Sequence, residues 1–112
     1  MYKELKKDNL LNILEKKTKK EKTIVFFGTV WCGTCELLKP KFKELGKKTK
    51  DIDFIYINAD ESPESKSIVD DLYNLPTFMG FKGLGHIFTR EGSEIDTVEN
   101  IIVGLRMEEP KL

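Results

Sequence analysis

Apolar residues recur along the chain at two different spacings, and these separate the predicted helices from the predicted strands. Apolar positions three or four residues apart indicate four helices, at 3–20, 32–48, a short stretch starting at Ser62, and 95–105. Short runs rich in β-branched and aromatic residues indicate four strands, at 23–27, 52–59, 78–81 and 86–90. The predicted order is helix, strand, helix, strand, helix, strand, strand, helix.

This order of elements predicts how the strands pair. Strands joined through a helix must run parallel with a right-handed crossover, whereas the last two, joined by a tight turn at 82–85, must be antiparallel. The strand at 23–27 has no polar break, which is typical of a central strand buried on both faces. We therefore predict an α/β fold with a mixed four-stranded sheet flanked by helices on both faces.

Length and composition indicate one soluble globular domain over residues 1–112. Hydrophobic residues make up 39% of the chain and charged residues 34%, and no apolar run approaches the roughly 20 residues that cross a bilayer. The first twenty residues alternate charged with apolar positions and lack the apolar core of a signal peptide. We expect a cytoplasmic protein.

The net charge of zero conceals a strong asymmetry along the chain. Residues 1–50 contain 14 Lys and 6 acidic residues, whereas residues 51–112 contain 5 basic and 13 acidic residues. The lysine-rich stretches lack interleaved aromatic residues and match no recognition motif, so we interpret them as solvated helix faces rather than a nucleic-acid site.

Both cysteines of the chain fall in one C-x-x-C, Cys32 and Cys35, between a predicted buried strand and a predicted helix. A closed zinc site lacks ligands, because the only histidine, His86, lies on a separate strand. A cluster held by two cysteines from each of two copies stays open. A purely structural disulfide is disfavoured, because so short a ring restrains the unfolded chain little.

A reactive pair has a physical basis in this placement. Residues i and i+3 on the first helical turn lie close enough for a disulfide to close and reopen. The unpaired N–H groups and the positive end of the helix dipole stabilise a thiolate at Cys32. We expect Cys32 to be the exposed nucleophile and Cys35 to be more buried and to resolve the mixed disulfide.

The segments "TIVFFGTVWCGTCELLKP", "INADESP" and "YNLPTFMGF" resemble the thioredoxin family, in the right order and spacing over residues 9–107. The resemblance implies a thioredoxin fold without a cofactor or metal. It also implies a monomer that reduces disulfides in client proteins and is recharged by a thioredoxin-reductase-type donor. Two alternatives stay open: a thiol oxidase or isomerase, and a binding module that holds a dimer-bridging iron–sulfur cluster.

The resemblance also assigns roles around Cys32 and Cys35. Trp31 would flank the disulfide at the surface, and Gly33 and Thr34 would tune its redox potential. Thr34 replaces the usual proline and frees a backbone N–H for the sulfur, which favours a somewhat more oxidising pair. The remaining residues would form a substrate-binding loop with a cis proline, and they are Tyr73, Leu75, Pro76 and Thr77.

Several positions depart from the family's pattern. Phe26 and Tyr56 stand where the family buries an aspartate and its lysine partner, so Cys35 lacks its usual base. Glu36 is a candidate substitute, although a solvated helix-surface glutamate is the favoured interpretation. Gly28 replaces a second tryptophan. Because the helical pattern begins almost at Met1, we expect the family's extra N-terminal strand to be absent.

Overall fold

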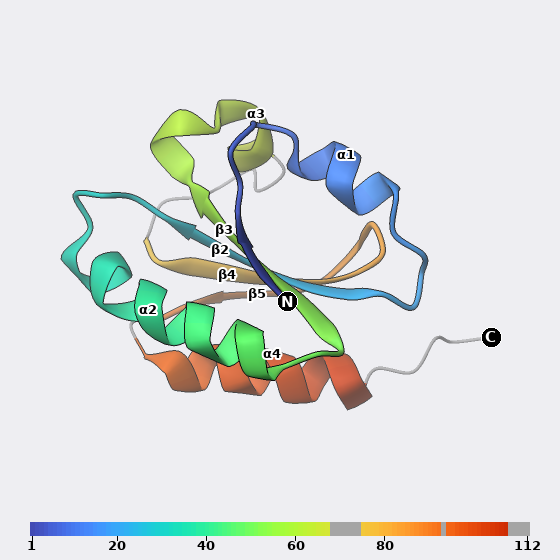
Figure 1. Cartoon of the computed structure of the whole chain (residues 1–112). Coiled ribbons are helices and arrows are strands. Elements are labelled where there is room, and N and C mark those ends of the chain that lie inside the picture. The colour runs from blue at the N-terminus through green and yellow to red at the C-terminus, as the bar shows by residue number, and fades with distance from the viewer. Residues whose placement is uncertain (68–74, 93, 108–112) are drawn as a thin grey trace.

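A five-stranded mixed sheet forms the centre of the protein, with helices on both faces (Figure 1). The computed structural model describes residues 1–67, 75–92 and 94–107. The strands are β1 (Tyr2–Glu4), β2 (Lys22–Gly28), β3 (Ile52–Asn58), β4 (Thr77–Lys82) and β5 (Gly85–Glu91), in the order β1-β3-β2-β4-β5. The helices are α1 (Leu10–Glu15), α2 (Gly33–Lys48), the 3₁₀-helix η1 (Ala59–Glu61), α3 (Pro63–Lys66) and α4 (Ile95–Met107).

The N-terminal segment is the main error of the sequence prediction. In place of one helix over 3–20, the chain forms β1, a connection and the short helix α1. β1 pairs in parallel with β3, where Tyr2 lies opposite Phe54, so the sheet has five strands rather than four. The amino group of Met1 donates to the carbonyls of Gly46, Thr49 and Ile52. These long-range contacts, which no local spacing reveals, override the helical pattern.

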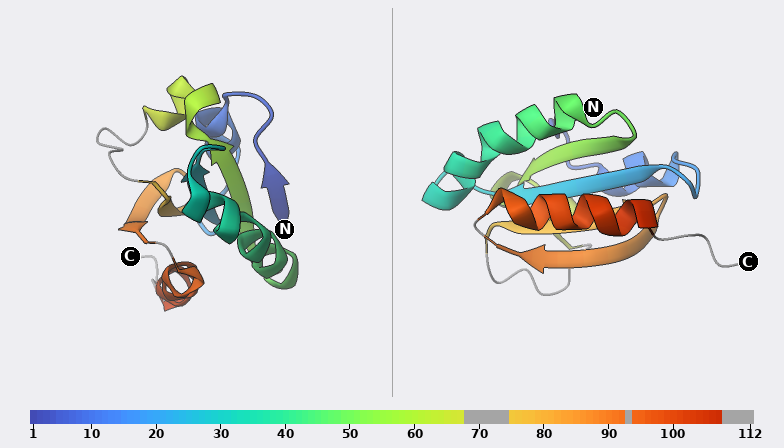
Figure 2. Two further views of the ribbon diagram at one scale, coloured as in Figure 1. Left: turned by 90° about the vertical axis from the view of Figure 1, so that its left-hand side faces the viewer. Right: turned by 90° about the horizontal axis from the view of Figure 1, so that it is seen from below.

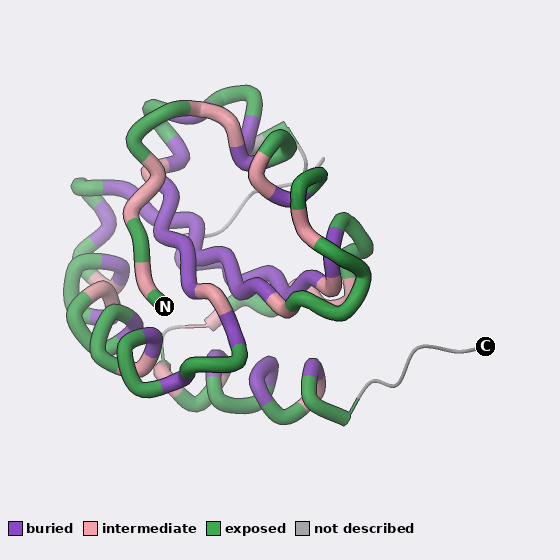
Figure 3. Tube along the Cα trace, turned by 45° about the vertical axis from the view of Figure 1, so that its right-hand side comes forward, coloured by how far each residue is buried: buried purple, intermediate pink, exposed green. Residues whose placement is uncertain are grey.

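The predicted pairing of the other strands is confirmed. β2 runs parallel to β3 and antiparallel to β4, and β4 and β5 form the expected antiparallel hairpin. Side chains of the central strands point alternately to the two faces of the sheet and form two hydrophobic cores. One lies under α2 and α4 and the other under α1 (Figure 2). Figure 3 shows the central strands buried along nearly their whole length, as expected for strands covered on both faces.

The third helix begins where the sequence predicts, and a carboxylate from a distant part of the chain caps it. Ser62 occupies the N-cap position and its side chain makes no capping hydrogen bond in the described part of the chain. Instead, the Asp8 carboxylate accepts hydrogen bonds from the backbone N–H groups of Glu64 and Ser65, at 2.7 and 2.6 Å. Burial raises the pKa of Asp8, but a hydrogen bond from the Ser65 side chain and these two backbone bonds together lower it. They tie the β1–α1 connection to α3.

Two buried threonines, one with and one without a described hydrogen-bond partner for its hydroxyl, test how the core is packed. The Thr23 hydroxyl is buried in β2 without a hydrogen-bond partner among the described residues, whereas the Thr49 hydroxyl donates to Leu45 O at 2.7 Å. We expect Thr23→Val to raise the free energy of unfolding by roughly 1 kcal/mol, because an unpaired hydroxyl leaves the core. Thr49→Val should lower it by about 1 kcal/mol. Denaturant unfolding of both variants checks the signs, and a loss of stability in Thr23→Val would contradict this description of the core.

Candidate functional site

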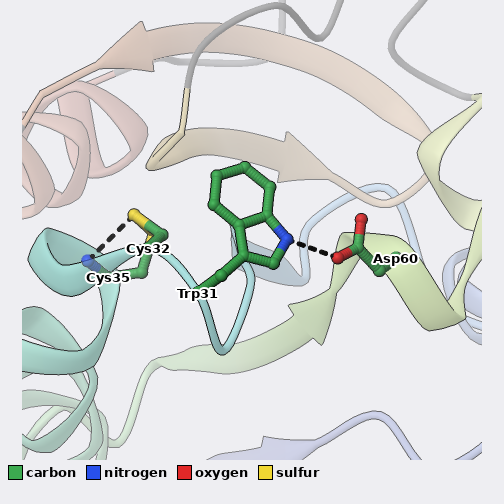
Figure 4. Close-up of a disulfide and its surroundings, with 4 residues drawn as sticks. All are labelled: Trp31, Cys32, Cys35 and Asp60. Carbon is green, nitrogen blue, oxygen red and sulfur yellow. Dashed lines mark hydrogen bonds between the residues drawn. A yellow bond between two sulfur atoms is a disulfide. The ribbon is translucent and has the colours of Figure 1, made fainter.

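The two cysteines lie at the carboxyl end of β2, where the chain turns into α2 (Figure 4). The Cys32 N–H donates to Thr29 O at 3.3 Å, and this turn directs the chain away from the sheet. Cys32 is the extended N-cap residue of α2, and Cys35 lies in its first turn. Their Cα atoms are 5.2 Å apart and their sulfurs form a disulfide. The predicted position at a strand end and helix start is confirmed.

The sulfur of Cys32 fills the capping position at the start of the helix. Its Sγ accepts a hydrogen bond from the backbone N–H of Cys35 at 3.2 Å. Helix N-termini leave such N–H groups unpaired, and they carry the positive end of the helix dipole. The 16-residue helix α2 therefore presents its N-terminus to this sulfur. The observed donor is the N–H of Cys35, and among the described residues no hydrogen bond joins the Thr34 N–H to Sγ.

Exposure distinguishes the two cysteines. Cys32 is 9% exposed and Cys35 is 0% exposed. Cys35 is the more buried of the two, as expected, but the expectation that Cys32 is exposed is wrong, because Cys32 is itself buried. A partner can therefore contact only a small part of Cys32 from solvent, and Cys35 presents no surface to solvent.

Trp31 forms one wall of the site. It is 69% exposed, which confirms its expected surface position, and its neighbour Val30 is 73% exposed. The indole Nε1 donates to Asp60 Oδ2 at 2.6 Å, as Figure 4 shows. Sequence analysis did not identify Asp60. The parallel pairing of β2 and β3 could have indicated it, because parallel neighbours end at the same edge of the sheet and Asp60 lies two residues after the end of β3.

The loop before β4 reaches the same edge of the sheet. Thr77 lies opposite Phe27 of β2, and Pro76 and Thr77 are buried. The Leu75–Pro76 peptide bond is cis, as the resemblance implies. Leu75 is half-buried and packs against the core that contains both cysteines. Tyr73, also assigned to this loop, lies outside the described residues.

Both the sequence and the fold are similar to those of known proteins. The family model Thioredoxin matches residues 1–103. The chain belongs to the thioredoxin family. It is 32% identical to Thioredoxin of Gallus gallus over 73% of this chain and 77% of that protein. A match to Thioredoxin-like 3-3 of Arabidopsis thaliana, at 29% identity, covers 79% of this chain and 62% of that protein. The crystal structure of Schistosoma mansoni thioredoxin superposes with a TM-score of 0.80 at 31% identity, covering 92% of this chain and 94% of that chain.

The C-x-x-C disulfide and this membership support thiol–disulfide oxidoreductase activity, and the predicted thioredoxin fold is confirmed.

The residues behind Cys35 nevertheless differ from the pattern of the thioredoxin family. Phe26 and Tyr56 are cross-strand partners with ring centroids 5.1 Å apart, and Phe78 lies 4.7 Å from Phe26. A packed aromatic cluster thus stands where the resemblance implies a buried ion pair, and such a cluster need not destabilise the fold.

Gly28 completes this cluster. A Cβ atom placed on Gly28 would lie 3.0 Å from Phe26 Cε1 and 3.1 Å from both Tyr56 Cε2 and Cys35 Cβ. The two aromatic rings and Cys35 therefore occupy the space that a larger residue at position 28 would need. The three departures at 26, 28 and 56 form one connected change in packing.

The nearest ionisable groups do not restore a buried base. Burial, together with the carboxylates of Glu36, Glu4 and Glu61, raises the pKa of Tyr56 to about 12. Tyr56 is therefore protonated at neutral pH. Glu36 is exposed on α2, as favoured from sequence. No cluster of three or more metal-ligating side chains occurs among the described residues, and His86 Nε2 contacts Phe88 O on its own strand at 2.9 Å.

Proposed function

We propose that this protein reduces disulfides in other proteins, with Cys32 as the nucleophile and Cys35 as the resolving thiol. The observation that carries the proposal is the hydrogen bond from the Cys35 N–H to Cys32 Sγ at the N-terminus of α2. The same donor and the helix dipole would stabilise the Cys32 thiolate in the reduced protein.

The reaction proceeds in two exchanges. The Cys32 thiolate attacks one sulfur of the client disulfide, a Cys32–client disulfide forms, and the other client sulfur leaves as a thiolate. Cys35 then loses its proton and attacks Cys32 Sγ. The Cys32–Cys35 disulfide forms, the second client sulfur leaves, and the client has gained two electrons.

The surrounding residues would bind the client. Trp31 offers an exposed aromatic surface beside Cys32, and Gly33 and Thr34 border the sulfur in the helix turn. The backbone of Leu75, ahead of β4, would pair with an extended client segment, while Pro76 and Thr77 hold that backbone in place. Tyr73 would extend the same loop.

The proposal places the protein in the cytoplasm, as a monomer that contributes to electron transport and cell redox homeostasis. A thioredoxin-reductase-type donor would return the Cys32–Cys35 disulfide to the dithiol. Cytosolic thiols are kept reduced, which suits net reduction of clients. No helix in the described ranges is long and apolar enough to span a membrane.

The alternative of a cluster shared between two copies is less well supported. Cys35 is fully buried behind Cys32, and a bridging metal would need both sulfurs at the surface. The first turn of α2 would have to move for such a cluster to form. The oxidase and isomerase alternatives use the same residues and differ only in redox potential.

Reduction of insulin disulfides, together with the redox potential of the Cys32–Cys35 pair, tests the proposed function. The pre-reduced protein should reduce insulin, and equilibration with glutathione should give a potential nearer the ~−270 mV of thioredoxin than the ~−120 mV of a strong oxidant. A potential near ~−120 mV would make the protein an oxidant and contradict the proposal. A pair that fails to exchange with insulin would contradict it as well.

A further inference from the structure

Three exposed carboxylates border the redox site, and we refer to Glu36, Asp60 and Glu61 as the acidic rim. Glu36 follows Cys35 in the first turn of α2. Asp60 holds the indole of Trp31, and Glu61 follows it in η1, so carboxylates flank the Cys32–Trp31 surface from two elements. Within the described ranges, none of the three forms an ion pair.

Two of the protein's cations form ion pairs with carboxylates outside the rim. Lys39 pairs with Glu4, and Arg106 donates two hydrogen bonds to Asp51, at 2.9 and 2.7 Å. Arg90 lies near the site end of β5, but its guanidinium packs over the Phe88 ring and donates to Thr89 O at 2.8 Å. Lys39 also lies 4.4 Å from the centre of the Tyr56 ring and offsets part of the negative charge of the rim, although in the described structure it forms no ion pair with the rim carboxylates. The negative charge of the rim also acts on the protein interior, because Glu36 and Glu61 both contribute to the raised pKa of Tyr56.

Several lysines lie at the opposite end of the sheet. β2 and β3 end at the site, so their first residues lie far from it, and there Lys22 faces Lys82 of β4. α2 starts at the site, so Lys47 and Lys48 in its last turn also lie at the far end. These lysines therefore lie far from the acidic rim.

We propose that the preferred clients are proteins whose disulfides are flanked by lysine or arginine beside an apolar residue. The apolar residue would contact Val30 and Trp31, which are 73% and 69% exposed, and the basic residues would face the acidic rim. This inference rests on the proposed function and adds the chemical class of its client. Unpaired surface charges around a binding site chiefly raise the association rate, and the effect weakens with salt.

Two synthetic disulfide peptides test the inference. They share one apolar sequence and differ only in the residues that flank the cystine, lysine in one and glutamate in the other. The pre-reduced protein is mixed with each peptide, and oxidation is followed by the fluorescence of Trp31, the one tryptophan in the chain. At about 0.01 M salt we expect the basic peptide to react about tenfold faster, and at about 1 M salt the rates should converge.

Variants that lack selected carboxylates test whether the acidic rim causes the preference for the basic peptide. Glu36→Gln/Glu61→Gln removes two charges without touching the Asp60–Trp31 hydrogen bond and should remove most of the preference. Glu15→Gln/Glu44→Gln removes two exposed charges, one at the end of α1 and one in the second half of α2, and should retain the preference. Equal rates for the two peptides at low salt, or an unchanged preference in the rim variant, would overturn the inference. If neither peptide is reduced, the proposed function itself is wrong.

Discussion

Cys35→Ser should accumulate a stable covalent complex between Cys32 and client proteins, whereas Cys32→Ser should form no such complex and lose disulfide reduction. Cys35 is 0% exposed and lies one helical turn from Cys32, so it is placed to attack only the Cys32 sulfur. Without it, the mixed disulfide must wait for an external thiol. We expect its lifetime to lengthen by at least about a hundredfold, as for other well-oriented intramolecular reactions that become bimolecular.

The complex can be measured by mixing each reduced variant with insulin and separating the products without reductant. The double variant Cys32→Ser/Cys35→Ser is the matched control, because it retains the fold but has no thiol. Complexes formed by Cys32→Ser and absent from Cys35→Ser would reverse the assigned roles. Retention of full reducing activity by Cys32→Ser would rule out the proposed mechanism.

Phe26→Asp should accelerate resolution of the mixed disulfide at neutral pH and destabilise the fold. The Phe26 ring is fully buried in the aromatic cluster behind Cys35, where a carboxylate would have its pKa raised toward neutrality. Such a group can accept the Cys35 proton, and we expect a gain of about tenfold to a hundredfold in the rate at pH 7. The buried carboxylate should cost about 3–5 kcal/mol of unfolding free energy.

Stopped-flow decay of a preformed mixed disulfide at several pH values separates these two effects. In the wild type, Cys35 must lose its proton to solvent, so the rate should rise steadily with pH through neutrality. In Phe26→Asp the rise should begin at lower pH. Phe26→Leu is the matched control, since it loosens the same cluster without adding a base. If Phe26→Leu accelerated resolution equally, the rate in the wild type would be limited by the tight packing of the cluster and not by proton transfer from Cys35.

Local sequence patterns correctly predicted the strands whose pairing partners follow from the order of helices and strands along the chain. β2 and β3 are apolar runs joined through a helix, so their parallel pairing follows from chain connectivity, and it brings Phe26 opposite Tyr56. The start of α2 at the C-x-x-C follows equally from the strand end and the helical spacing after it. The principal residues of the site could therefore be placed before the structure.

Contacts between distant segments account for what sequence analysis missed. The side chains of Tyr2 and Glu4 suit a helix or a strand, and only the exposed edge of β3 makes them a strand. Asp60 looks like an ordinary turn residue until β3 places it beside Trp31. The role of Gly28 depends on three side chains that approach one point from β2, β3 and α2. None of these contacts leaves a periodic signal in the chain.

The central claim is that the N-terminus of α2 holds the Cys32 sulfur as an anion in the reduced protein. Titration of the thiolate absorbance of reduced Cys35→Ser, which leaves Cys32 as the only thiol, tests the claim directly. We predict that Cys32 ionises with a midpoint at or below ~7.5, in the range of cysteines at helix N-termini. A midpoint at the ~8.5 of free cysteine would contradict the account, because the Cys35 N–H and the helix dipole would then contribute nothing to reactivity.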